Sequence, residues 1–305
     1  MSFNEEKNFQ GISEYVKISP YTNYKIGGEA RYFIEIKSKK DLIRALFFAK
    51  KCNAPFFILG GGSNLLFSDL GFNGLVIRMK NSGIKMENDG RIAKLTAQAG
   101  TKLAEVVDFA KNNLLGGMEW AIGIPGTVGG AIRGNAGAFA GSMKDCVKSV
   151  QALDAQSDNF KTAKFLNESC QFGYRTSFFR KNKSFIILSC EIELKTKNKK
   201  EIEKEMKNYL NKKTSTQPLE FPSAGSVFTN PNGLAAGKLI EDCGLKGKKI
   251  GGAQISEKHA NFIINFGHAT ARDVKDLIAE AKSIVKRKFG VDLEEEIEII
   301  ESDIK

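Results

Sequence analysis

Two glycine-rich stretches are the residues of this sequence whose types and spacing most clearly could do chemistry. A short apolar run, residues 56–59, leads directly into three glycines, residues 60–62, and then into Ser63 and Asn64. A second stretch, residues 123–131, reads Gly-Ile-Pro-Gly-Thr-Val-Gly-Gly-Ala. Glycine accepts positive φ and lets another group approach the backbone, and successive bare N–H groups form a concave surface that suits an anion. Two such loops suggest a large phosphate-bearing ligand, such as a dinucleotide cofactor.

The first glycine stretch alone does not identify its ligand. It lacks the dinucleotide fingerprint Gly-x-Gly-x-x-Gly, and it lacks the Gly-Lys-Ser/Thr ending of a P-loop. A tight structural turn explains this stretch about as well when it is taken by itself. The second stretch, which is followed by Asn135-Ala-Gly137, makes a ligand site the better interpretation of the pair.

A few polar residues outside these stretches could also carry chemistry. Arg175 lies among small and aromatic neighbours, and arginine suits bidentate binding of a carboxylate or phosphate. Ser226 follows Gly225, and His259 is the only histidine with a plausible route to it, so a Ser/His hydrolase is an open alternative despite the missing Gly-x-Ser-x-Gly elbow. Glu296 lies in Leu-Glu-Glu-Glu-Ile, where a solvated acidic strand edge is the default interpretation.

Composition indicates a globular protein with room for two domains. The chain has 305 residues, of which 42% are hydrophobic and 27% are charged. No apolar run is long enough to span a membrane, so we expect no membrane partner. Residues 1–10 are polar and lack the apolar core of a signal peptide, which predicts a cytoplasmic protein. We expect a monomer.

The net charge of +11 has a plain explanation in lysine-rich helix and loop surfaces, at residues 195–213 and 246–249. No aromatic interleaving or recognition motif accompanies it, so we expect no nucleic-acid partner, although the charge would favour capture of anionic substrates. The five cysteines form no Cys-x-x-Cys pair, and the only histidines are His259 and His268. We therefore expect reduced, mostly buried thiols and no metal site.

Hydrophobic periodicity predicts the elements that must position these residues. Strands are predicted at 30–36, 55–59, 75–79, 91–99, 147–154, 159–165, 185–194 and 293–300. Helices are predicted at 41–52, from a cap at Thr101, at 201–210, and from the capping-box-like Thr270-x-x-Asp273 to Gly290. Because strict βαβ alternation is missing, this order favours an α+β fold over a doubly wound sheet.

Two further expectations concern the second half of the chain. The helix at 201–210 should bury a face made of Ile202, Met206, Tyr209 and Leu210. The polar stretch 195–200 is the best candidate for a domain boundary.

Nine short motifs occur in order along the chain. They are Tyr24-Lys-Ile-Gly-Gly, Leu59-Gly-Gly-Gly-Ser-Asn-Leu-Leu, Gly123-Ile-Pro-Gly-Thr-Val-Gly-Gly, Asn135-Ala-Gly-Ala, Gly173-Tyr-Arg-Thr-Ser, Pro222-Ser-Ala-Gly-Ser-Val-Phe, Gly244-Leu-Lys-Gly, Lys258-His-Ala-Asn-Phe and Leu293-Glu-Glu-Glu-Ile. Together they closely resemble the UDP-N-acetylenolpyruvoylglucosamine reductase family. The resemblance covers residues 21–300, and the short spacing between Arg175 and Ser226 resembles the group that lacks the tyrosine-bearing substrate lid.

The resemblance implies a fold and an activity. The fold would be a vanillyl-alcohol-oxidase-type FAD-binding domain at residues 1–197, with subdomains at about 1–80 and 81–197, and a smaller α+β substrate-binding domain at 198–305. The activity would be reduction of the enolpyruvyl group of a UDP-sugar in peptidoglycan precursor synthesis. FAD, bound non-covalently, would be the cofactor, and NADPH the hydride donor.

The resemblance also implies residue roles. Ser226 would deliver a proton to substrate C2, while Arg175 and Glu296 lie near the negative charge that develops after hydride reaches C3. The cofactor positions would be Leu59, Gly60, Gly61, Gly62, Ser63, Asn64, Leu65, Gly123, Ile124, Pro125, Gly126, Thr127, Gly129, Gly130, Asn135, Gly137 and Ala138. The substrate contacts would be Tyr174, Asn230, Lys246, Gln254 and His259.

The sequence departs from the family pattern at some positions, and other functions remain open as alternatives. Thr229 replaces a residue that is often basic in the family, and Phe139 replaces one that is commonly tyrosine. Another flavin oxidase or dehydrogenase of the same fold is the nearest rival, although no histidine precedes His259 to anchor a covalent flavin. A non-catalytic nucleotide-binding module is the rival from a different class, and the Ser/His hydrolase comes third.

Overall fold

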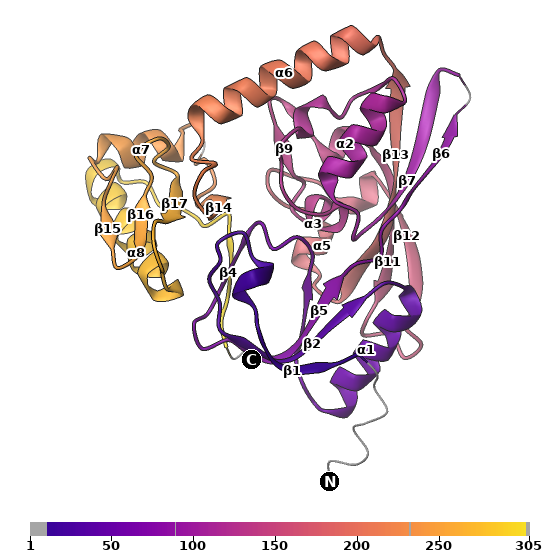
Figure 1. Cartoon of the computed structure of the whole chain (residues 1–305), viewed down its shortest axis with the longest axis horizontal. Coiled ribbons are helices and arrows are strands. Elements are labelled where there is room, and N and C mark those ends of the chain that lie inside the picture. Colours follow the sequence, from indigo (N-terminus) through magenta and orange to yellow (C-terminus); the bar gives the residue numbers. More distant parts are fainter. Residues whose placement is uncertain (1–10, 89, 232, 303–305) are drawn as a thin grey trace. The chain divides into compact units, whose positions relative to one another are not determined.

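The computed structural model describes residues 11–88, 90–231 and 233–302 (Figure 1). Residues 1–10, on which the expectation of a missing signal peptide depends, lie outside this range. The described residues form two compact units. Unit 1 contains residues 34–61 and 76–212, and unit 2 contains residues 13–33, 62–75 and 213–302. The domain boundaries predicted near residues 80 and 197 do not coincide with the divisions between these units, and they stay a prediction.

Unit 1 is built on an antiparallel sheet whose long central strand is β13 (Figure 1). The strand order is β12 (Thr162–Leu166), β11 (Val147–Asp154), β13 (Phe185–Thr196), β7 (Ile92–Gln98) and β6 (Ile84–Asn88), and β8 (Leu115–Gly116) pairs with the end of β13. Alternate residues of β7, namely Ala93, Leu95 and Ala97, are buried, which is the period-two pattern that predicts a strand.

Short helices carry the site residues of unit 1 onto this sheet. They are α3 (Val128–Arg133), α4 (Met143–Cys146) and α5 (Phe178–Lys181), and all three pack against β13. The other elements of this part are α2 (Leu103–Asn112), η3 (Glu119–Ala121), β9 (Gly137–Ala138), β10 (Gly141–Ser142) and η4 (Glu168–Cys170).

A second sheet has the strand order β1 (Ser13–Lys17), β2 (Glu29–Ile36), β5 (Phe72–Met79) and β3 (Phe56–Leu59). The division between the units falls within β2 and β5, which continue from one unit into the other. In unit 1, β3 leads into the first glycine stretch and α1 (Lys39–Lys51) precedes it. The Ser38 side chain caps α1 by accepting from Asp41 N–H, and the reciprocal hydrogen bond lowers the pKa of Asp41.

Helix α6 (Lys199–Thr216) corrects one expectation about the chain after β13. Because β13 continues to Thr196 and α6 begins three residues later, only residues 197 and 198 lie between them, and a domain boundary at 195–200 stays a prediction. Ile202 and Met206 are buried as predicted, but the Leu210 side chain is 42% exposed. The helix runs beyond residue 210, and its inward face continues at Lys213, which is 6% exposed.

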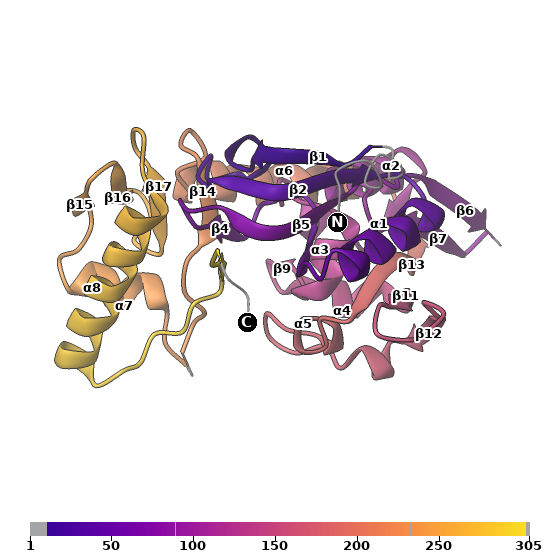
Figure 2. The same ribbon diagram turned by 90° about the horizontal axis from the view of Figure 1, so that it is seen from below.

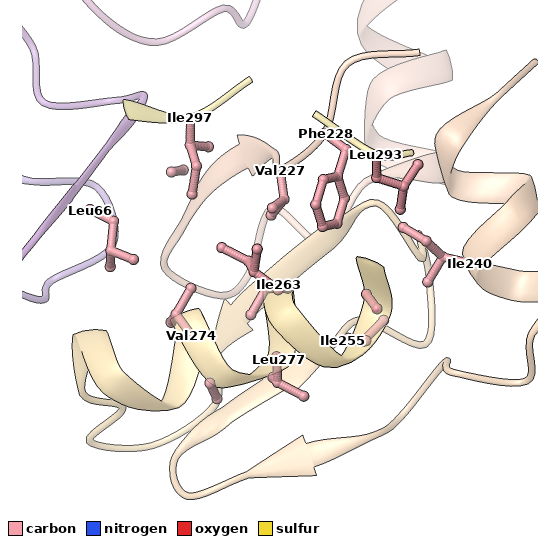
Figure 3. Close-up of a cluster of buried hydrophobic side chains, with 14 of the residues drawn as sticks. Leu66, Val227, Phe228, Ile240, Ile255, Ile263, Val274, Leu277, Leu293 and Ile297 are labelled. Carbon is pink, nitrogen blue, oxygen red and sulfur yellow. The ribbon is translucent and has the colours of Figure 1, made fainter. Parts of the chain in front are cut away.

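Unit 2 has a small antiparallel sheet covered by one long helix. The strand order is β14 (Ser223–Ser226), β17 (Phe262–Asn265), β16 (Ala253–Ile255) and β15 (Lys249–Ile250). Helix α8 (Ala271–Phe289) packs on β15 and β16, and α7 (Ala236–Asp242) packs beside α8 (Figure 2). The apolar residues Val227, Ile263 and Leu277 gather in the core between these layers (Figure 3). The remaining elements are η2 (Ser19–Tyr21), β4 (Leu65–Phe67) and β18 (Glu298–Ile300).

The ends of α8 confirm the sequence interpretation. Thr270 and Asp273 form the capping box, and Gly290, with φ +70°, ends the helix. Asp69 adds a second cap, since its carboxylate accepts from Ala271 N–H at 2.8 Å and from Arg272 N–H at 3.1 Å. Within the described part of the chain, no helix has both the length and the apolar character needed to cross a membrane.

Two predicted element ends are wrong. Lys102, not Thr101, is the N-cap of α2, because the Thr101 hydroxyl is engaged with the backbone of Gly83. The final strand is regular only at β18, which runs parallel to β4. Residues 294–296 instead make irregular backbone contacts with residues 227–229, so the simple alternation expected for 293–300 does not hold.

Candidate active site

The two glycine stretches meet within unit 1. A Cβ placed on Gly60 would lie 2.6 Å from Thr127 Oγ1, and one on Gly61 would lie 2.5 Å from Gly126 Cα. Real Cβ atoms essentially never approach to under 3.0 Å, so both positions require glycine. We call these four residues the cofactor contact. Two stretches that are far apart in the sequence therefore lie backbone against backbone.

Thr127 lies in this contact, at the start of α3. Its hydroxyl is buried and has no hydrogen-bond partner among the described residues. A buried polar group without a partner costs about 1–3 kcal/mol, so the position favours a ligand atom that completes the bond. A phosphate oxygen accepts from a hydroxyl and can approach a glycine backbone closely. The residues present thus fit the pyrophosphate of a dinucleotide cofactor.

Part of the second stretch is already engaged within the protein. Val128 N–H donates to Thr101 O and Gly129 N–H donates to Ala99 O, both at 2.9 Å. These hydrogen bonds tie the first turn of α3 to the segment after β7. The Thr127 hydroxyl is therefore a better candidate for a phosphate contact than either of these two amides.

The other half of the first stretch belongs to unit 2. Gly62 has φ +65°, and a Cβ there would lie 2.1 Å from Tyr21 O. The Asn64 side chain donates through Nδ2 to Glu296 O, and Asn64 O accepts from Glu298 N–H, both at 3.0 Å. Asn64 thus holds the C-terminal segment in place, and its predicted contact with the cofactor stays a prediction.

Arg175 lies in a tight turn of unit 1 that is fastened to the segment after α3. Gly173 and Thr176 pair across the turn, and Arg175 has φ +55°. Asn135 Nδ2 donates to Gly173 O, and Arg180 Nη1 donates to Arg175 O, both at 2.8 Å. Non-glycine residues in the left-handed region cost about 1–3 kcal/mol and cluster at functional sites. The surrounding hydrogen bonds therefore hold Arg175 in a fixed, strained position.

Tyr174, a predicted substrate contact, lies beside this arginine. The Arg175 guanidinium carbon is 5.2 Å from the centre of the Tyr174 ring, and Tyr174 is 58% exposed. An exposed aromatic ring next to a positive charge is suited to a planar anionic ligand.

Ser226 ends β14 and pairs with Phe262 of β17. The residues that follow it are held by Asn261, which is 4% exposed. Val227 N–H donates to Asn261 O at 2.8 Å. Phe228 N–H donates to Asn261 Oδ1 at 3.0 Å, and Asn261 Nδ2 donates back to Phe228 O at 2.8 Å. These bonds fix the backbone that carries the serine.

Asn261 belongs to the motif Lys258-His-Ala-Asn-Phe, and the family resemblance implies no role for it. The available signal is an asparagine between the apolar residues Ala260 and Phe262, at the start of an apolar run. A polar side chain there is expected to be buried, and a buried amide needs partners.

The C-terminal segment covers the other side of the same backbone. Glu296 N–H donates to Val227 O at 2.8 Å, and Thr229 N–H donates to Glu294 O at 2.9 Å. The backbone of Glu296, a predicted catalytic residue, is therefore hydrogen-bonded in unit 2 to Val227, the residue that follows the predicted proton donor Ser226. We call residues 226–229, Asn261 and residues 294–296 the catalytic join.

The three consecutive glutamates of this segment have different surroundings. Glu295 forms an ion pair with Lys282 of α8 at 2.8 Å, and Glu294 O is engaged by Thr229. Glu296 is the one whose backbone is held on both sides, by Val227 and by Asn64. These backbone hydrogen bonds distinguish the position of Glu296 from those of its two neighbours.

The predicted substrate contacts of unit 2 all have partners within the protein. Asn230 Oδ1 accepts from Ala236 N–H at 3.0 Å and so helps to begin α7. Gln254 Nε2 donates to Gly247 O at 3.2 Å, and Lys246 forms an ion pair with Glu241 at 3.0 Å. These contacts show how the side chains are positioned, and their contact with substrate stays a prediction.

His259 has a structural environment. Its Nδ1 accepts from Asn261 N–H at 3.2 Å, and its ring packs against Phe262 and the Gly237 position of α7. Burial lowers the pKa of His259 below its ordinary value. Among the described residues no hydrogen bond joins His259 to Ser226, which weakens the Ser/His hydrolase alternative.

Comparison with known protein families gives matches over both halves of the chain. An FAD-binding domain model matches residues 30–162, and the model of the UDP-N-acetylenolpyruvoylglucosamine reductase C-terminal domain matches residues 217–300. The UDP-N-acetylenolpyruvoylglucosamine reductase of Clostridioides difficile is 43% identical over 284 residues, which is 93% of this chain and 91% of that protein. The corresponding protein of Caldanaerobacter subterraneus is 43% identical over 281 residues, 92% of this chain and 90% of that protein.

A solved structure gives the same picture. The UDP-N-acetylenolpyruvylglucosamine reductase (MurB) of Thermus caldophilus is 33% identical, with a TM-score of 0.79, and the match covers 93% of this chain and 97% of that one. The α+β fold class, with an FAD-binding domain followed by a smaller domain, is confirmed.

Proposed function

The chain belongs to the UDP-N-acetylenolpyruvoylglucosamine reductase (MurB) family, and from that premise we propose the full reaction and the role of each residue. The protein is an FAD-dependent oxidoreductase of peptidoglycan precursor synthesis that acts on a UDP-sugar. We propose that it converts UDP-N-acetylglucosamine enolpyruvate to UDP-N-acetylmuramate, with NADPH as the hydride donor and non-covalent FAD as the cofactor.

The observation that supports this assignment best is the hydrogen bond from Glu296 N–H to Val227 O. It joins the backbone of Glu296 to the residue that follows Ser226, although the two segments are far apart in the sequence. A serine and a glutamate carried by hydrogen-bonded backbone segments would suit delivery of one proton to a basic carbon.

The cofactor contact supplies the groups that would hold FAD. The Thr127 hydroxyl would donate to a pyrophosphate oxygen, and the glycines at positions 60 and 61 keep side chains away from that approach. FAD, when bound, supplies transfer of a hydride from NADPH to substrate C3. The protein's own contribution is binding and orientation at these atoms.

The protein completes the reduction with a proton. Hydride at C3 leaves negative charge at C2 and on the carboxylate conjugated to it, and the Arg175 guanidinium would stabilise that charge. Ser226 Oγ would then give its proton to C2, so that one hydride and one proton add across the double bond. Serine is a weak acid at neutral pH, so this step depends on the basicity of C2 and on Glu296 beside the serine.

Two finer statements belong to the same proposal. We propose that the enzyme is a monomer and that it acts in the cytoplasm, where its nucleotide-sugar substrate and NADPH would be available. The family membership of the chain supports both statements.

The test is an anaerobic absorption experiment on the purified protein. A flavin band that bleaches with NADPH and recovers only on addition of UDP-N-acetylglucosamine enolpyruvate would support the proposal. A flavin that recovers only with oxygen would indicate an oxidase of the same fold. A colourless protein that cannot be reconstituted with FAD would contradict the proposal and favour a nucleotide-binding module.

A further inference from the structure

One face of α6 contacts the elements on both sides of the second glycine stretch. Glu205, Tyr209 and Lys212 follow one another at spacings of four and three residues, which places them on the same side of a helix. All three belong to unit 1, as do the elements they contact. We call these three residues the α6 contact face.

The first contact consists of ion pairs and joins α6 to η3, which precedes the second glycine stretch in the sequence. Glu119 begins η3 and is 6% exposed. Its carboxylate accepts from Gly117 N–H at 2.7 Å and from Lys197 Nζ at 3.0 Å. Lys197 Nζ also donates to Glu205 at 2.7 Å, so one ammonium joins η3 to α6. Burial alone would lower the pKa of Lys197, but these two hydrogen bonds outweigh it and raise the pKa.

The second contact is an aromatic one, after the glycine stretch. Phe139 lies at the tip of the β9–β10 hairpin and stacks on Tyr209, with ring centres 4.5 Å apart and planes 10° apart. Lys212 Nζ lies 5.8 Å from the centre of the Phe139 ring. By the family resemblance, Phe139 lacks the hydroxyl of a residue that is commonly tyrosine. In the structure its ring has a partner on α6.

The hairpin tip has a conformation that its residues do not favour. Phe139 and Ala140 have φ values of +52° and +66°. Two successive positive φ values are typical of a type I′ turn, where asparagine and glycine are preferred. Such a turn needs an outside contact to hold it, and the stack on Tyr209 is that contact.

The two contacts are also joined to each other. A Cβ on Gly141 of the hairpin would lie 2.5 Å from the Trp120 ring, and Trp120 Nε1 donates to Gly117 O at 3.0 Å. Trp120 follows Glu119 in η3. The segment before the glycine stretch, the hairpin after it and α6 therefore all contact one another, and two of these segments flank residues 123–130 in the sequence.

We propose that the α6 contact face positions the second glycine stretch for FAD, with Tyr209 and Glu205 as positioning residues that need no contact with the cofactor themselves. The inference rests on the proposed binding of FAD at the cofactor contact. Loss of either contact would release one of the two segments that flank the second glycine stretch. Thr127 and its neighbours would then have to be ordered when the cofactor binds.

The test compares Tyr209→Ala with the neighbouring control Leu210→Ala. Leu210 is an exposed apolar residue on the same helix turn, outside the α6 contact face. Deflavinated protein is titrated with FAD, and binding is followed by flavin fluorescence and by the emission of Trp120, the only tryptophan in the chain. We expect Tyr209→Ala to weaken FAD binding about tenfold and to shift the Trp120 emission, with less than about a twofold change for Leu210→Ala.

Two further variants keep the test decisive. Tyr209→Phe retains the ring and should bind FAD like the wild type. Glu205→Gln removes one charge without removing volume and should weaken binding about threefold, which serves as the test if Tyr209→Ala does not fold. Wild-type FAD affinity in Tyr209→Ala and Glu205→Gln, with only a lowered melting temperature, would overturn the inference. Failure of the wild type itself to bind FAD would instead overturn the proposed function.

Discussion

The cofactor contact of unit 1 and the catalytic join of unit 2 differ in how completely their polar groups are hydrogen-bonded within the protein. Each brings together segments that are far apart in the sequence. In the cofactor contact, the Thr127 hydroxyl is buried with no partner among the described residues. In the catalytic join, Asn261 and the C-terminal segment engage the backbone of residues 227–229 on both sides.

The difference indicates which part of the site depends on its ligand. A buried hydroxyl without a partner is a cost that bound FAD would remove, so the cofactor contact should become more ordered on binding. The catalytic join already has its hydrogen bonds and needs no ligand to place Ser226. A group that must deliver a proton at one atom gains from being fixed beforehand.

The largest effect should come from the catalytic join. Ser226→Ala removes the proposed proton donor, so we expect product formation to fall by about 10²- to 10⁴-fold, while reduction of FAD by NADPH stays at the wild-type rate. Stopped-flow absorbance of the two half-reactions measures this directly. Ser223→Ala, on the same strand, is the matched control and should retain turnover. An equal loss in both half-reactions would make Ser226 structural and remove the contrast.

Glu296→Gln should act in the same half-reaction with a smaller loss. The backbone hydrogen bond to Val227 remains in this variant, and only the carboxylate charge is lost. We expect product formation to fall by about 10²-fold, with normal reduction of FAD. Unaltered turnover in single-turnover assays would exclude Glu296 from the proposed site.

Asn261 should account for much of the rigidity of the catalytic join. Asn261→Leu would leave the buried N–H and C=O groups of Phe228 without partners, at a cost of about 2–4 kcal/mol in the free energy of unfolding. Denaturant unfolding followed by circular dichroism measures the change. Asn208→Ala, at an exposed position of α6, provides a control that should change stability very little. A loss below about 0.5 kcal/mol for Asn261→Leu would mean that the join is held by other contacts.

One substitution in the cofactor contact, Thr127→Val, should preserve or raise the stability of the deflavinated protein while it lowers the affinity for FAD. Thr127→Val removes the buried hydroxyl, so the deflavinated protein should be as stable as the wild type or more stable. FAD affinity should fall about fivefold, which corresponds to one hydrogen bond of about 1 kcal/mol. Thr127→Ser should restore the affinity. Equal FAD affinity in Thr127→Val would show that the hydroxyl does not contact the cofactor.

The smallest expected effect is on the pH dependence of stability. Burial lowers the pKa of His259, so the folded state binds its proton more weakly than the unfolded state does. The resulting stability is present above the unfolded pKa of about 6.5 and is lost as the pH falls toward the folded value. Melting temperatures measured from pH 7.5 to 5 should fall more steeply for the wild type than for His259→Asn. Parallel curves would assign the pH dependence to other groups.

Much of the fold could be predicted because local patterns decide it. Alternating buried residues match the predicted strand β7, and the Thr270–Asp273 capping box with Gly290 sets both ends of α8. The misplaced features depend on partners distant in the sequence. The hydroxyl of Thr101 is engaged by Gly83 rather than by α2, and residues 294–296 follow the irregular backbone of residues 227–229.

The site could be predicted in part for the same reason. The family motifs pointed to Ser226, Arg175 and Glu296, and glycine chemistry pointed to both loops. No local pattern reveals that Gly61 lies against Gly126, or that Asn261 holds both sides of Phe228, since both depend on how separate segments pack. The role of Phe139 was missed because its partner Tyr209 lies on a helix 70 residues further along the chain.

The contrast between the two regions is tested most directly by amide hydrogen exchange with and without FAD. We expect FAD to slow exchange strongly in residues 60–61 and 126–127, where binding completes the contact. Exchange in residues 227–229 and at Glu296 should be slow in both states, because these amides are already hydrogen-bonded. Fast exchange in the catalytic join that becomes slow only with FAD, or no change in the glycine stretches, would contradict the account.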